Sequence, residues 1–173
     1  MTPPQQHRDA DIQQAIDDYL LARQAILKLG REVPGRIGGN DNIIGRIGEF
    51  IGLRFLEALG QEPVMMTGSS NPGFDLIEGD QRTQIKAITH ENKRGRSVRL
   101  TPGWTQFVLM ELGEHYTPER IGLLTSTQQE IALADNFAKT ATPIVSLTML
   151  GPKGLISRYG RVYNQDELRA LMV

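Results

Sequence analysis

Two short apolar segments separated by a Gly-Asp turn constrain the fold of this chain more than any other feature. The segments Phe74–Ile77 and Thr83–Ile88 are rich in strand-forming residues, and Gly79 and Asp80 stand between them. A two-residue loop that contains glycine is typical of a β-hairpin, because glycine adopts the positive φ angle that a tight hairpin turn requires. The sequence therefore predicts two neighbouring antiparallel strands here.

The hairpin also determines which polar side chains are expected to lie close together. If Gly79 and Asp80 form the loop, counting outward along both strands pairs Asp75 with Gln84. Side chains alternate between the faces of a strand, so Lys86 shares a face with Gln84, and opposed residues have Cβ atoms about 5 Å apart. An acid, an amide and an amine are therefore expected to converge; the alternative is an exposed polar face without a role. The other face, expected to be the inner one, carries Phe74, Leu76, Ile85 and Ala87.

The rest of the chain predicts helices before, among and after a run of strands. A helical apolar period extends over residues 9–29 and 43–59, a third helix is expected over 127–139, and a last one near 164, where Asn164 and Glu167 have the spacing of a capping box. Such an order is typical of one α/β (α+β) domain, here residues 1–173, with a central mixed sheet flanked by helices. The predicted strands are residues 64–67, 74–77, 83–88, 106–112 and 120–125.

The second predicted helix carries glycines on one side. Gly45, Gly48 and Gly52 lie beside its apolar arc, and Glu49 lies at the far edge of these glycines. Each glycine inside a helix costs about 1 kcal/mol relative to alanine, so their presence indicates that something packs closely against that side. We expect the neighbour to be the sheet, which would bring Glu49 to the hairpin.

The composition restricts the chemistry that the chain can perform. The sequence has no cysteine, which excludes disulfides, thiolate metal sites and thiol nucleophiles. Carboxylates, amides, lysine and histidine remain, so oxygen-ligated hard metals are the expected cofactors. The net charge of −1 gives no overall attraction to nucleic acid, so such a partner must meet a local basic patch.

The ends and the hydropathy of the chain give no sign of a membrane protein. The first residues are too polar for a signal peptide, and no segment approaches the roughly 18 consecutive apolar residues of a membrane-spanning helix. We therefore expect a cytoplasmic protein without a membrane partner.

The order of Glu49, Asp75 and Gln84-Ile85-Lys86 resembles the PD-(D/E)XK nuclease superfamily, which includes many restriction endonucleases. The resemblance implies a Mg²⁺ site, in which Mn²⁺ can substitute, with Asp75 as the main ligand and Gln84 as the second. It also implies that the backbone carbonyl of Ile85 completes the set and that Glu49 binds the metal directly or through water. Lys86 would position or deprotonate a water molecule; orientation is the safer assignment, since a lysine base must lose its proton near neutral pH.

Two features depart from the pattern of that superfamily, which the chain resembles over roughly residues 43–125. Pro72 stands three residues before Asp75 instead of next to it, and Gln84 replaces the second acid. An amide oxygen still binds a hard cation, but the site loses one negative charge. A non-catalytic DNA-binding or assembly subunit with the same fold is therefore the alternative to an active deoxyribonuclease.

A basic segment follows the hairpin and gives the local patch that a nucleic acid would need. Its candidate DNA-binding residues are His90, Lys93, Arg94, Arg96 and Arg99. Arginine suits bidentate phosphate contacts, and the segment directly follows Lys86. A solvated basic loop without a partner is the alternative.

Two further features bear on assembly and on the core. The first helix, residues 9–29, is expected to cover the sheet or to form a homodimer interface, because nucleases that cut both strands of a duplex commonly pair with two-fold symmetry. Trp104 is expected at the edge of the core, with stacking on a base as the alternative.

Overall fold

The structure is a computed structural model that describes residues 3–32, 43–66, 73–89 and 98–172. It divides into two compact units, Met1–Ile43 and Ile44–Val173. The described part of the first unit is one helix, α1 (Pro3–Glu32), which begins and ends beyond the predicted range 9–29. No helix within the described ranges is long and apolar enough to cross a membrane.

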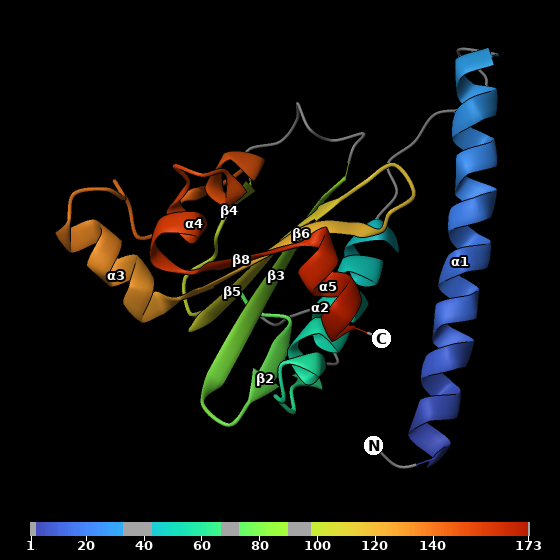
Figure 1. Cartoon of the computed structure of the whole chain (residues 1–173), viewed down its shortest axis with the longest axis horizontal. Coiled ribbons are helices and arrows are strands. Elements are labelled where there is room, and N and C mark those ends of the chain that lie inside the picture. Colours follow the sequence, from blue (N-terminus) through green and yellow to red (C-terminus); the bar gives the residue numbers. More distant parts are fainter. Residues whose placement is uncertain (1–2, 33–42, 67–72, 90–97, 173) are drawn as a thin grey trace. The chain divides into compact units, whose positions relative to one another are not determined.

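The second unit is built on a six-stranded mixed sheet (Figure 1). Its central strands β3 and β5 run parallel, and every other neighbouring pair is antiparallel. In spatial order the strands are β1 (Val64–Met65), β2 (Leu76–Glu78), β3 (Gln81–Thr89), β5 (Gln106–Leu112), β6 (Pro118–Thr125) and β8 (Arg161–Asn164). The mixed sheet and its flanking helices confirm the predicted α/β class.

Helices cover both faces of this sheet. One cluster of buried side chains joins α2 (Ile43–Ala58) and α5 (Gln165–Leu171) to the first face. A second cluster joins α3 (Ser126–Ala134), the 3₁₀ helix η2 (Leu147–Leu150) and α4 (Leu155–Tyr159) to the other face. A two-stranded sheet of β4 (Val98–Arg99) and β7 (Ile144–Val145) borders this second layer. Trp104, only 8% exposed, belongs to this second cluster, which confirms the expected core position.

The predicted hairpin is present with the predicted turn. Gly79 has a φ of 56°, the left-handed conformation that favours glycine, and Glu78 pairs with Gln81. The antiparallel ladder continues only as far as Leu76 and Thr83. Asp75 therefore lies at the point where β2 leaves β3, and not in a ladder pair with Gln84 as the count from the turn predicts.

The glycines of α2 explain how closely this helix approaches the sheet. A Cβ atom added to Gly48 would lie 2.8 Å from the Cβ of Ala87, and one added to Gly52 would lie 2.6 Å from Cδ1 of Ile85. Both contacts are shorter than real side chains allow, so the prediction of close packing is confirmed at these two positions. It is wrong for Gly45, where nothing lies within 4 Å.

The expectation that only one face of β3 lies inward is wrong. Ile85 belongs to the cluster under α2, as predicted. On the opposite face, however, Gln84 is only 3% exposed and Ile88 packs against the cluster under α3 and α4. The physical reason is that β3 pairs with a parallel neighbour, and parallel strands are ordinarily covered on both sides. The polar residues of β3 are thus held within a layered structure rather than displayed on an open face.

Candidate metal site

Asp75 is held by three hydrogen bonds at the end of β2. Its backbone N–H donates to the carbonyl oxygen of Thr83 at 2.7 Å, and its carbonyl accepts from the N–H of Met66 at 3.0 Å. Its Oδ2 accepts a hydrogen bond from the backbone N–H of Ile85 at 2.6 Å. The carboxylate thus takes the place that a backbone carbonyl of β2 would occupy if the ladder continued. Asp75 is bound to the middle residue of the Gln84-Ile85-Lys86 segment.

The carbonyl group of Ile85 points to the same edge as its N–H. In a strand the N–H and C=O of one residue face the same neighbouring strand, so both groups of Ile85 face β2. Since the N–H of Ile85 reaches the Asp75 carboxylate, the carbonyl oxygen of Ile85 also faces the place where β2 diverges. Its role as a metal ligand stays a prediction.

Gln84 lies next to this edge but is held by the neighbouring loop. Its Oε1 accepts a hydrogen bond from the backbone N–H of Thr101 at 3.2 Å. The contact with a donor assigns the oxygen, not the nitrogen, to this side of the amide. An amide oxygen has two lone pairs, and this hydrogen bond occupies one of them.

Glu49 reaches the site from α2, and its electrostatics place it near the other candidate residues. Partial burial and the negative charge of Asp75 raise the pKa of Glu49, while the positive charges of Lys86 and Arg46 lower it. Because Gly48 packs against Ala87, α2 crosses β3 near Ala87. The next residue of the helix, Glu49, therefore lies close to the same part of β3. The structure therefore brings Glu49, Asp75 and Lys86 into one electrostatic neighbourhood.

Lys86 lies on the opposite face of β3 from α2. It pairs with Leu109 of the parallel strand β5, and its side chain is half-buried. Its positive charge nevertheless acts to lower the pKa of Glu49 on α2. The β2–β3 ladder ends close to these residues, at Leu76 and Thr83.

The chemistry of this donor set suits a hard cation. Asp75 and Glu49 supply carboxylates, Gln84 an amide oxygen and Ile85 a carbonyl oxygen, and oxygen donors of these kinds are the ligands that Mg²⁺ and Mn²⁺ prefer. Two of the four are side-chain acids, which is why the part of the chain that the structure describes contains no group of three or more His, Cys, Asp or Glu residues arranged for a metal. The residues fit a metal whose site is completed by neutral oxygens.

The predicted DNA-binding segment is described only at its end. His90, Lys93, Arg94 and Arg96 lie outside the described residues. Arg99 is exposed on β4, and its Nη1 donates to the carbonyl oxygen of Thr142 at 3.3 Å.

Two residues near the site were missed by the sequence interpretation. Thr101 holds the oxygen of Gln84 through its backbone, a role that no side-chain pattern signals. Arg46 is exposed one helical turn before Glu49 and acts on the charge of that residue. Its spacing from Glu49 on a predicted helix is the signal that could have found it.

A scan against protein-family models finds no match for this chain, and a search of curated proteins finds no relative. The candidate site therefore stands on its own geometry.

Proposed function

We propose that this protein is a metal-dependent endonuclease of restriction-endonuclease-like fold that hydrolyses DNA phosphodiester bonds. The observation that carries the proposal is the hydrogen bond from the N–H of Ile85 to Asp75, 2.6 Å long. It sets a carboxylate beside a Gln-Ile-Lys segment, and Glu49 lies within electrostatic reach of both. The negative charge of Asp75 raises the pKa of Glu49. A cation bound between the two carboxylates would offset this repulsion, which supports Mg²⁺ or Mn²⁺ as the cofactor.

The metal, when bound, would neutralise charge on the phosphate and lower the pKa of a water molecule. The side chains of the protein would hold the metal and position the attacking water. Asp75 keeps a fixed orientation because Oδ2 is held by Ile85, which leaves Oδ1 to bind the metal. Lys86, half-buried beside the acids, holds the attacking water by hydrogen bonding and offsets negative charge on the phosphate.

The proposal extends to the setting in which the enzyme works. A two-fold homodimer would place two sites on the two strands of a duplex. The cytoplasm is the compartment that fits a protein without cysteines that acts on DNA. DNA is the proposed partner, contacted through the basic segment that ends at Arg99.

Cleavage of a supercoiled plasmid tests the proposal. Purified protein with Mg²⁺ or Mn²⁺ is expected to nick or linearise the plasmid, and EDTA is expected to stop the reaction. Asp75→Ala and Lys86→Ala should each lower the rate by a factor on the order of 100 or more, since both remove a group that acts on the reacting atoms. Arg169→Ala, an exposed change on α5, is the matched control. Undiminished cleavage by both site variants would overturn the assignment.

The second candidate is a non-catalytic DNA-binding or assembly subunit, and the environment of Gln84 favours it. The side chain is 3% exposed and its oxygen already accepts the N–H of Thr101, as in a residue with a structural role. If the wild type shifts DNA in a salt-dependent manner but never cuts with either metal, this second candidate is correct.

A further inference from the structure

A shallow pocket lies in the layer of α3, η2 and α4, apart from the candidate metal site. It has a volume of about 290 Å³ and is formed by residues after α3, by β7 with the start of η2, and by the residues that lead into α4. Its lining combines apolar and polar residues. The lining includes Phe137, Lys139, Ile144, Ser146, Thr148 and Lys153.

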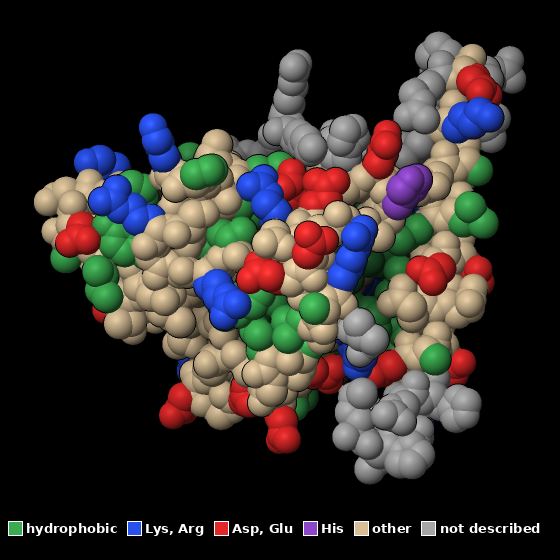
Figure 2. All heavy atoms as spheres, viewed as in Figure 1, with side chains coloured by type: hydrophobic (Ala, Val, Ile, Leu, Met, Phe, Trp, Pro, Cys, Tyr) green, Lys and Arg blue, Asp and Glu red, His purple; other side chains and the backbone are tan. Residues whose placement is uncertain are grey.

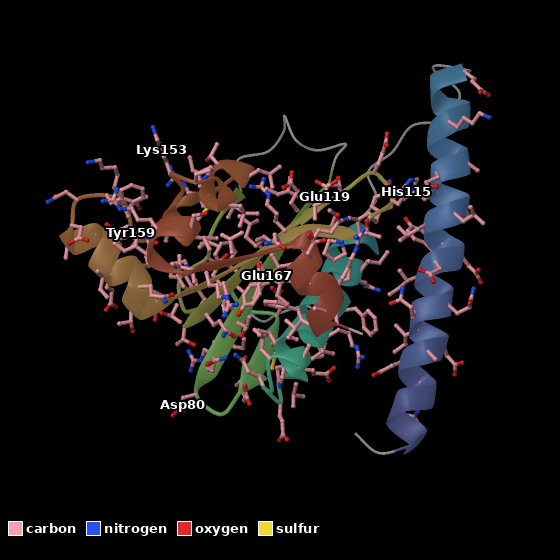
Figure 3. All side chains as sticks on the ribbon, in the orientation of Figure 1. Asp80, His115, Glu119, Lys153, Tyr159 and Glu167 are labelled. Carbon is pink, nitrogen blue, oxygen red and sulfur yellow. The ribbon has the colours of Figure 1, made fainter. Side chains whose placement is uncertain are left out.

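The charged side chains that line this pocket are both positive. Lys139 and Lys153 line it and are exposed, and the described lining residues include no acid. Arg158, also exposed, lies with its guanidinium carbon 4.9 Å from the ring centre of Phe137, whose side chain also lines the pocket. In Figure 2 the Lys and Arg side chains gather over α3 and α4, next to hydrophobic side chains, and in Figure 3 Lys153 projects outward beside α4. A concave basic surface with hydroxyl groups suits an anion.

The hydroxyl groups of Ser146 and Thr148 line the pocket and can donate hydrogen bonds to a ligand. The Oγ of Ser146 and the Oγ1 of Thr148 lie 2.6 Å apart, and both residues line the pocket. A hydroxyl pair of this kind can donate one proton outward to a phosphate oxygen while the two oxygens keep their mutual hydrogen bond. Lysine ammonium groups and hydroxyls are the usual contacts of proteins with the DNA backbone.

The pocket is linked to Gln84, a proposed metal ligand, by two consecutive residues. The N–H of Leu100 donates to the carbonyl oxygen of Pro143, which lines the pocket, at 3.3 Å. The N–H of the next residue, Thr101, donates to Oε1 of Gln84 at 3.2 Å. Adjacent Cα atoms are about 3.8 Å apart, so the two hydrogen bonds start from neighbouring points of the backbone. Arg99, paired with Ile144 of the pocket, lies on the same connection.

We propose that this pocket is a second phosphate-binding site for the DNA substrate, in which Lys139 and Lys153 hold a backbone phosphate away from the scissile bond. The proposal rests on the proposed function, because it takes the occupant to be the DNA strand whose other phosphate lies at the metal site. Its role is to position the strand, so its loss weakens binding without removing any group of the metal site.

Equilibrium binding in EDTA tests the pocket without the complication of cleavage. A fluorescently labelled DNA duplex is titrated with the full chain at several salt concentrations, and the slope of log K against log salt is measured. Lys139→Ala/Lys153→Ala should weaken binding about tenfold and reduce the magnitude of the slope by about 1.8, since each phosphate contact contributes about 0.9. Thermal unfolding of the variant confirms that it is folded.

The matched control removes two positive charges elsewhere. Arg161→Ala/Arg169→Ala changes exposed residues of β8 and α5, on the other side of the sheet, and should keep the wild-type affinity and slope. If the pocket variant binds DNA like the wild type with an unchanged slope, or if the control loses as much affinity as the pocket variant, the pocket proposal is wrong and the proposed function is untouched. If the wild type neither binds nor cuts DNA, the proposed function fails, and the pocket proposal fails with it.

Discussion

The carboxylate of Asp75 accepts a hydrogen bond from the backbone N–H of Ile85 at 2.6 Å, in the position where a backbone carbonyl of the neighbouring strand would otherwise stand. This side-chain contact closes the end of the β2–β3 ladder and orients the acid beside the Gln84-Ile85-Lys86 segment. Because one oxygen of Asp75 has a structural task and the other faces the candidate site, the two tasks can be separated by substitution.

Asp75→Asn and Asp75→Ala are expected to differ in stability but not in activity. Asparagine can still accept the N–H of Ile85, so its thermal unfolding should stay close to that of the wild type. Alanine leaves a partly buried donor without its acceptor, which costs about 1–3 kcal/mol. Both lose the negative charge and should lose metal-dependent cleavage. Equal destabilisation by the two variants in a urea titration would contradict the assigned role of this hydrogen bond.

Glu49→Gln is expected to change how stability depends on pH. Burial and the charge of Asp75 raise the pKa of Glu49 in the folded state, so the folded protein holds this proton more tightly than the unfolded chain does. Protonated Glu49 therefore adds to the free energy of unfolding. This contribution is fully present below the ordinary glutamate pKa of about 4.3, and it is lost as pH rises through the raised pKa. In EDTA the variant should therefore be more stable than the wild type at pH 8.

The same comparison at about pH 3, below the ordinary glutamate pKa of about 4.3, supplies the internal control, since position 49 is then largely neutral in both proteins and they should unfold at similar urea concentrations. Glu130→Gln, an exposed residue of α3, should show no such pH-dependent gain. A Glu49→Gln variant that is less stable than the wild type at pH 8 would show that the acid is held by favourable contacts instead.

Gly48→Ala is expected to move α2 and with it Glu49. The added methyl group would stand 2.8 Å from the Cβ of Ala87, an atom fixed to the backbone of β3, so the helix must shift. Overpacking of this kind costs about 1–3 kcal/mol. Thermal unfolding should show the loss, and cleavage should fall because Glu49 is displaced from Asp75.

Gly45→Ala is the matched substitution on the same helix. Nothing lies within 4 Å of a Cβ at Gly45, so the change should stabilise the protein by up to about 1 kcal/mol through helix propensity alone. If Gly45→Ala and Gly48→Ala change the midpoint of unfolding in the same direction, the close approach of α2 to β3 is not as described.

Gln84→Glu is expected to strengthen metal binding and to weaken the metal-free fold. A third carboxylate increases the negative charge of the donor set, so Mn²⁺ affinity measured by calorimetry should rise at least about tenfold. Without metal, the new charge lies at a position that is only 3% exposed, and the melting temperature in EDTA should fall. Mn²⁺ should restore it. An unchanged Mn²⁺ affinity in this variant would show that Gln84 is not a metal ligand.

Local sequence signals predicted the parts of the fold that depend on local physics. Three of these predictions are confirmed: the Gly79-Asp80 turn, the packing of Gly48 and Gly52 against the sheet, and the capping box of Asn164 with Glu167. Each depends on residues close in sequence or on the face of one helix. The strand Gln106–Leu112 was also predicted at its observed bounds, because the apolar residues 107–110 form its centre.

The features that were missed depend on residues distant in sequence. The strands β4 and β7 have two residues each and exist only through their mutual pairing, which no local period signals. Asp75 lies outside the β2–β3 ladder, and its side chain, instead of a backbone carbonyl, accepts the N–H of Ile85. The oxygen of Gln84 is held by Thr101, which lies in the connection between β3 and the parallel strand β5.

The most direct test of the central claim is the position of Mn²⁺ in crystals of the protein soaked with that ion, measured by its anomalous scattering. The account predicts one peak at about 2.1–2.3 Å from Oδ1 of Asp75 and the carbonyl oxygen of Ile85, with Gln84 or Glu49 among the remaining ligands. A well-occupied crystal with no anomalous peak beside Asp75 would contradict it.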